Sequence, residues 1–173
     1  MSQPTNLAEP WLRGTLAEVP AVQRAVLHAL QAAEEDLAKW CSELTDNEMQ
    51  QRPAGLASVV FHLQHIPGSV DRLLTYAEGR ELSAEQLHAL KLEGSGAISA
   101  ENALQAFSQA MAASVDRVRQ FDPAHLEEPR YVGRRRMPTT VGGLLVHVAD
   151  HTQRHVGQAV TTARVLVGNR TVS

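Results

Sequence analysis

The chain has 173 residues, of which 43% are hydrophobic and 20% charged, and its formal net charge is −3. This length and composition fit one globular domain over residues 1–173, and the weak negative charge excludes a general attraction to nucleic acid or anionic membranes. The N-terminus lacks signal-peptide character, no apolar window approaches the roughly 18 residues of a membrane span, and the single cysteine cannot form an internal disulfide. We therefore expect a cytoplasmic protein whose termini, about residues 1–15 and 169–173, are loosely held.

The first half of the chain contains two segments with helical periodicity. One runs from about residue 20 to 44 and repeats apolar residues at spacings of three and four. Asp46 then predicts the cap of a short turn. The other helix is predicted over about residues 58–78. Pro67 lies inside it, and because proline removes a backbone donor, we expect a kink or a loosened turn beside His65.

The second half begins with a longer connection, in which Ser83 and Gln86 have the spacing of a capping box and predict a short helix. Further helices are predicted over about residues 99–121 and 139–167, with a polar loop between them. No stretch alternates as a strand does. The sequence therefore predicts an all-α fold, a four-helix bundle with a longer connection between its second and third helices.

Histidines give the clearest functional signal. Three of the eight stand four residues apart near the C-terminus, at His147, His151 and His155. On a helix, any adjacent pair of these can bind a single metal ion. Two more, His62 and His65, lie in the second predicted helix. This pattern is typical of a metal site built from two helices.

Helical-wheel angles indicate which of these side chains face the core. At about 100° per residue, His151 and His155 lie nearer the buried stripe than His147, whose position suits a supporting hydrogen bond. In the second helix the same angles favour His62 over His65. A proline distorts that turn, however, so the spacing leaves this choice open.

Three neutral imidazoles suit a borderline divalent ion and leave a coordination position open, where the metal can act as a Lewis acid on water or substrate. A closed structural zinc site would more typically contain cysteines. The competing interpretation is that these are ordinary hydrogen-bonded histidines. We expect that ordinary role, at the surface or its edge, for His28, His88 and His125, which have no partner at ligand spacing.

Other polar residues give weaker signals. Gln158 is placed to hydrogen-bond a ligand or a metal-bound water. Glu93, Asp71 and Asp150 are candidates for a general acid or base, although Asp150 points away from its histidine neighbour. The arginines at 134–136 could face an anionic substrate near the mouth of the site, but such runs are usually solvated loops. No nucleophile motif, phosphate-binding loop or dinucleotide fingerprint is present.

Two stretches carry the histidines: LTDNEMQQRPAGLASVVFHLQHIPGSVDRLLTYAEGR and TTVGGLLVHVADHTQRHVGQAVTTARVL. The Leu-Thr-Asp…Arg-Pro lead-in, the His-Leu-x-His-Ile helix and the final His-x-x-x-His-x-Gly-Gln together resemble the DinB-like superfamily of four-helix metalloproteins, which includes the YfiT-type proteins. The resemblance covers nearly the whole chain. In that family one histidine of the second helix joins two of the last helix around a metal. By motif these are His65, which precedes Ile66, and the pair His151 and His155.

The resemblance implies a metal-dependent enzyme acting on a small molecule, either a hydrolase or a transferase that uses a low-molecular-weight thiol, and is compatible with a homodimer. Zinc or nickel is the expected metal, and iron and manganese also suit three imidazoles. The alternative is a metal- or small-ligand-binding bundle without turnover. The reaction itself stays open, because fold and metal site do not determine it.

Overall fold

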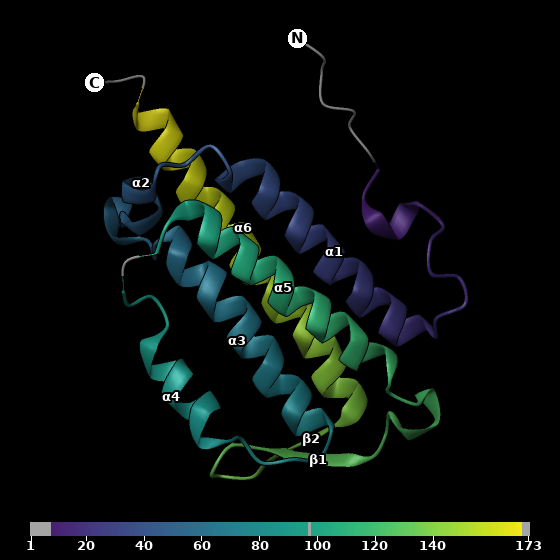
Figure 1. Ribbon diagram of the computed structural model, residues 1–173. Helices are drawn as coiled ribbons and strands as arrows, with labels where there is room; N and C mark the ends of the chain where they lie inside the picture. The colour runs from purple at the N-terminus through teal and green to yellow at the C-terminus, as the bar shows by residue number, and fades with distance from the viewer. Residues whose placement is uncertain (1–7, 97, 171–173) are drawn as a thin grey trace.

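Four long helices make up most of the computed structural model, which describes residues 8–96 and 98–170 (Figure 1). They are α1 (Ala21–Cys41), α3 (Val59–Ala77), α5 (Ala100–Arg119) and α6 (Val141–Asn169). Side-chain caps start three of them, because the hydroxyl groups of Ser58, Ser99 and Thr140 each accept a backbone N–H of the first turn. The predicted all-α four-helix fold is confirmed.

The order of the helices around the bundle differs from their order in the chain. α1 packs against α5 and α6, and α3 packs against the same two helices, so α1 and α3 lie diagonally opposite. In Figure 1, α1 and α6 run toward the end that carries α2, whereas α3 and α5 run toward the opposite end. Consecutive helices α3 and α5 can run in the same direction because the connection between them carries the chain back along the bundle.

That connection contains α4 (Ala84–Leu92), whose predicted capping box forms between Ser83 and Gln86. None of its residues is buried, so α4 lies on the outside of α3 as an added layer (Figure 1). The four-helix core beneath it is formed by the apolar side chains that the long helices direct inward. Its fully buried large side chains include Leu30, Leu74, Met111 and Leu145.

α3 continues as one helix through Pro67. The helix is not broken there, and the kink or loosened turn expected beside His65 stays a prediction. Proline removes one backbone hydrogen bond, but the flanking residues Ile66 and Val70 are buried in the core. This packing supports the helix on both sides of the proline.

Two short strands, β1 (Pro129–Val132) and β2 (Met137–Thr140), form an antiparallel hairpin where the sequence predicted a polar loop. That prediction was wrong because strands of four residues are too short to show a clear alternation. The hairpin lies across one end of the bundle (Figure 1). The run of three arginines lies in its turn, directly before β2, with all three side chains exposed.

The cap of the short helix α2 (Asp46–Gln50) also differs from the prediction. Thr45, rather than Asp46, is the capping residue, and it forms a capping box with Glu48. The Asp46 carboxylate instead accepts the backbone N–H of Ala100 over 2.7 Å. It therefore links α2 to the start of α5.

Both ends of the described chain are attached to the bundle. Pro10–Leu12 forms a short 3-10 helix against α1, and Arg13 pairs with Glu35 at 2.6 Å. Residues 1–7 and 171–173, part of the termini predicted to be loose, lie outside the described residues. None of the helices in the described part of the chain has the length and apolar character that a transmembrane segment requires.

Replacing Arg170 with alanine should remove the ion pair that joins the end of α6 to α2. Arg170 donates from Nε to Glu48 over 2.6 Å, and this arginine, followed by the Thr45 backbone, lowers the pKa of Glu48 to about 2 from an ordinary value of 4.5. We expect Arg170→Ala to lower the Tm at pH 7 by about 1–3 °C, the effect of an exposed ion pair.

The stability that wild type gains from this ion pair, measured as its Tm difference from Arg170→Ala, should depend on pH over a defined range. Because the folded-state pKa of Glu48 is depressed, its contribution is present above about pH 4.5 and is lost as the pH falls toward 2. The Tm difference between wild type and Arg170→Ala should therefore shrink across that window in thermal scans. Arg135→Ala, in an exposed turn, is the control. A difference that stays constant from pH 7 to pH 2 would contradict the assignment.

Candidate metal centre

Three histidines from two helices meet in the interface between α3 and α6. His65, His151 and His155 each offer one ring nitrogen, and these three atoms lie within 4.8 Å of one another. The Nε2 atoms of His65 and His151 are 3.0 Å apart. Two ligands of a tetrahedral zinc ion, each about 2.0–2.1 Å from the metal, lie about 3.3 Å apart. The spacing of these imidazoles therefore fits a common metal ion.

The helices place these side chains by simple periodicity. His151 and His155 are four residues apart on α6 and so project on the same side, beside the buried residues Thr152 and Val156. Both histidines are half-buried, as is His65. The site therefore lies at the edge of the α3–α6 interface, between the core and solvent.

His62, the second-helix histidine favoured by the wheel, is the more deeply buried, with 1% of its surface exposed. Its Nδ1 lies 3.2 Å from Nδ1 of His155, but His62 is not part of the three-nitrogen group. The helical wheel identified the α3 histidine that faces the core. The three-nitrogen group lies nearer to solvent, and it contains the histidine one turn further along α3. His65, which the motif indicated, is the α3 residue that the structure brings into that group.

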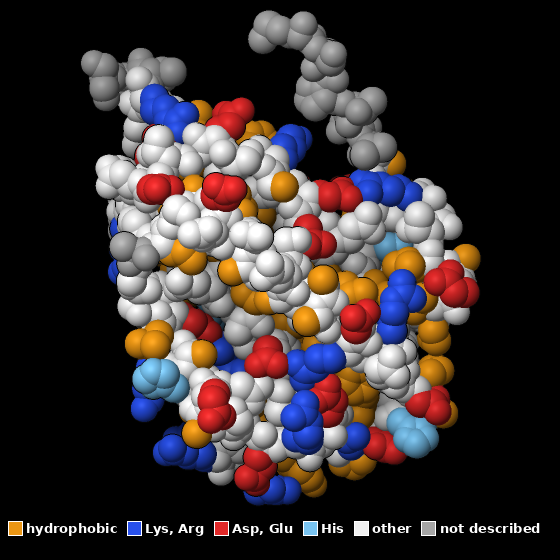
Figure 2. Space-filling view, viewed as in Figure 1, with side chains coloured by type: hydrophobic (Ala, Val, Ile, Leu, Met, Phe, Trp, Pro, Cys, Tyr) orange, Lys and Arg blue, Asp and Glu red, His pale blue; other side chains and the backbone are white. Residues whose placement is uncertain are grey.

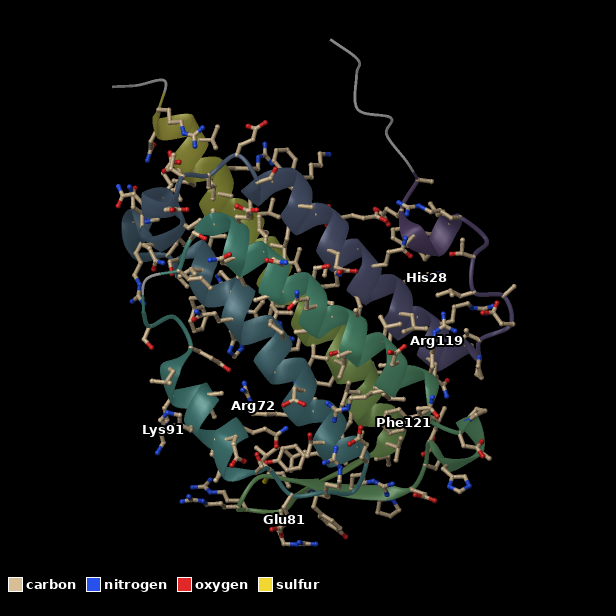
Figure 3. The ribbon with its side chains drawn as sticks, viewed as in Figure 1. His28, Arg72, Glu81, Lys91, Arg119 and Phe121 are labelled. Atoms are coloured by element: carbon tan, nitrogen blue, oxygen red, sulfur yellow. The ribbon has the colours of Figure 1, made fainter. Side chains whose placement is uncertain are left out.

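His147 and His28 also have defined positions. His147 is exposed, and its Nδ1 lies 3.8 Å from Asp150 rather than within the group. His28 is buried on α1 beside the N-terminal segment, where its Nε2 lies 3.2 Å from the Thr15 hydroxyl (Figure 3). Its burial differs from the surface position expected from the sequence, because residues preceding α1 fold over it.

A buried carboxylate supports His65 from behind. Glu93, at the end of α4, lies with Oε2 2.6 Å from His65 Nδ1, and its Oε1 accepts Arg72 at 2.7 Å. Only 8% of the Glu93 side chain is exposed, and Figure 3 shows Arg72 between α3 and α4. Because a carboxylate only accepts hydrogen bonds, Nδ1 carries the ring hydrogen, and the Nε2 lone pair points toward His151. Metal-binding histidines are commonly oriented in this way.

Two glycines let the Glu93 segment approach α3 closely. A Cβ added at Gly68 would lie 2.7 Å from Glu93 Oε1, and one added at Gly94 would lie 2.9 Å from the Phe61 ring. The Phe61 ring in turn stacks on the His65 ring, with centroids 5.1 Å apart and planes 12° from parallel. These glycines thus give space to both groups that hold the His65 ring.

The electrostatics favour neutral imidazoles. Burial, followed by the neighbouring histidines, lowers the pKa of His151 to about 4, and the same causes lower the pKa of His62 to about 4. Burial also lowers the pKa of His155. Histidines with depressed pKa values keep their lone pairs at neutral pH, which is the form that binds metal.

A cavity of about 460 Å³ adjoins the histidines. Its lining includes His62, which contacts His155, and Arg154, Gly157 and Gln158 of α6. The Gln158 side chain lies within hydrogen-bonding reach of His155. The volume is within the range of small-molecule sites. None of the three grouped histidines lines this cavity, which borders the group through His62 and Gln158.

Comparisons with known proteins agree with this architecture. A family model described as the DinB superfamily matches residues 29–159. The chain belongs to the DinB superfamily. The crystal structure of a conserved protein from Enterococcus faecalis matches this DinB chain with a TM-score of 0.64 and 22% identity, over 87% of this chain and 99% of that one. At this identity the match shows a shared fold. No curated protein matches.

The remaining sequence candidates lie elsewhere in the DinB bundle. Asp71 pairs with Arg117 at 2.6 Å, and Asp150 pairs with Arg154 at the surface. Burial raises the pKa of the Cys41 thiol to about 12, so this cysteine stays protonated in the core. Of the acid–base candidates, Glu93 is the one that the structure places against a histidine of the group.

Proposed function

We propose that the protein binds a divalent metal ion through His65, His151 and His155 and uses an open coordination position in a reaction on a small molecule, either hydrolysis or transfer of a low-molecular-weight thiol. The observation that carries this proposal is the set of three imidazole nitrogens within 4.8 Å of one another, contributed by two helices. Three nitrogen ligands suit zinc or nickel, and also iron or manganese. Membership of the DinB superfamily supports the same metal-binding role.

When bound, a divalent ion supplies Lewis acidity and lowers the pKa of a coordinated water or thiol. The side chains around it have separate tasks. The Glu93 carboxylate fixes the ring and tautomer of His65. Gln158 is placed to hydrogen-bond a group that approaches His155. Arg154 lines the adjoining cavity, but its charge is paired with Asp150.

The test is metal content by elemental mass spectrometry on untagged protein, followed by a panel of thiol-conjugation and ester-hydrolysis substrates with the metal found. We expect about one metal ion per chain and turnover that a chelator abolishes and the metal restores. Stoichiometric metal without turnover across the panel would support a binding protein instead. Protein that stays without metal after incubation with zinc, nickel and manganese would overturn the proposal.

A further inference from the structure

A second cavity, of about 500 Å³, lies at the hairpin end of the bundle. The end of α3, the start of the α3–α4 connection and the β-hairpin form its walls, and Figure 3 shows Glu81 at this end of the molecule. No histidine lines it. Tyr76, one of its α3 residues, follows His65 by eleven positions, which corresponds to about 16 Å along the helix. The cavity is thus separate from the candidate metal centre.

Positive charge dominates the lining, because four arginines face one acidic residue, Glu81. They are Arg80, Arg130, Arg134 and Arg136. In Figure 2, basic side chains gather at this lower end of the molecule, with acidic ones among them.

Two of the four arginines already form ion pairs or hydrogen bonds with other groups of the protein. Arg80 pairs with Glu78, and Arg130 bonds Glu128 at 3.0 Å and the Ala77 carbonyl at 2.8 Å. Among the residues that the structure describes, Arg134 and Arg136 have no carboxylate partner. Their charges are available to an anion, and the two occupied arginines help to define the walls.

The cavity also has an aromatic and apolar wall. Tyr76, Tyr131, Leu82 and Leu87 line it, and the exposed fractions of Tyr131 and Leu87 are 47% and 41%. The Arg136 guanidinium lies over the Tyr131 ring, 4.6 Å from its centroid. A cation held against a ring gives one surface that attracts both a negative group and a flat apolar one.

The hairpin turn holds Arg136 in an unfavourable backbone conformation. Its φ of +48° is in the left-handed region, which costs free energy for a residue with a Cβ. Its N–H closes the turn onto the Gly133 carbonyl at 3.0 Å. The turn therefore keeps Arg136 in place over Tyr131.

We propose that this cavity binds a small organic anion, with a phosphate or carboxylate group on Arg134 and Arg136 and a flat apolar body against Tyr131 and Tyr76. The two charged arginines provide the anion contacts, and the tyrosines provide the stacking surface. The proposal does not depend on the metal centre, since none of its residues belongs to the histidine group.

The chain's composition allows a direct test, because both of its two tyrosines line the cavity. Protein with 13C-labelled tyrosine rings is titrated with phenyl phosphate and followed by NMR, with Tyr131→Phe assigning the signals. We expect saturable shifts of both rings. Arg134→Ala/Arg136→Ala should raise the Kd at least about tenfold, and so should Arg134→Glu, which changes an exposed turn position. The matched control is Arg135→Ala, in the same turn but outside the lining.

Companion titrations define the ligand class. Benzoate in place of phenyl phosphate distinguishes a carboxylate from a phosphate preference, and either preference supports the proposal. Inorganic phosphate that binds as tightly as phenyl phosphate would overturn it, because the aromatic wall would then contribute nothing. Binding that persists in the double arginine variant but is lost in His151→Ala would place the anion on the metal centre and overturn it. The absence of saturable tyrosine shifts up to about 10 mM phenyl phosphate would also overturn the proposal.

Discussion

His151→Ala and His65→Ala should each abolish stoichiometric metal binding under conditions where wild type holds about one ion per chain. Apparent binding free energies of structural zinc sites with four ligands are about 10–16 kcal/mol, so one ligand contributes about 2.5–4 kcal/mol. Removing one imidazole should therefore weaken the affinity by about 10²–10³-fold. Elemental mass spectrometry gives the stoichiometry, and competition with a chromogenic chelator gives the affinity.

Two other histidines provide matched controls. His147→Ala removes an exposed imidazole one turn before His151 on the same helix, so it should leave the metal affinity unchanged. His62→Ala removes a buried ring that contacts His155 without joining the group, so it should keep stoichiometric binding, with circular dichroism confirming the fold. Metal retained by His65→Ala but lost by His62→Ala would contradict the assignment of the α3 ligand.

The sequence predicted the helices well because their apolar stripes and caps are local features. Ser58 and Ser99 stand where the predicted second and third helices begin, and both act as caps. The spacing of His151 and His155 predicted a shared direction for the same reason, since a helix alone determines it. These features depend on neighbours along the chain and not on tertiary packing.

Other parts of the site depend on packing between distant segments, which periodicity cannot show. The wheel ranked His62 above His65 because it measures direction relative to the core, whereas the histidine group lies at the interface edge. Glu93 stood out as a titratable residue, but its contact with His65 spans 28 positions. Gly94, directly after Glu93, has a positive φ of 75° and lies close to Phe61, so it helps to place Glu93.

Glu93→Gln should weaken metal binding without abolishing it. The glutamine side chain matches glutamate in shape and can still accept the Nδ1 hydrogen of His65, but it lacks the negative charge of the carboxylate beside the site. Changes to such supporting groups typically cost about 10–100-fold in metal affinity. We therefore expect the Kd measured by chelator competition to rise by that factor, while the stoichiometry at saturating metal stays near one ion per chain.

The connection that carries Glu93 offers its own control. Glu81→Gln makes the same chemical change in the same connection, but at the hairpin end (Figure 3), where Glu81 belongs to a cavity lining that contains no histidine. The metal affinity of this variant should therefore equal that of wild type. The comparison separates two roles of Glu93, because its bonds to His65 and Arg72 also attach the end of α4 to α3. A Glu93→Gln protein with a lowered Tm but unchanged metal affinity would show that the carboxylate only attaches α4. Weaker metal binding at an unchanged metal-free Tm would show that it positions the His65 ligand.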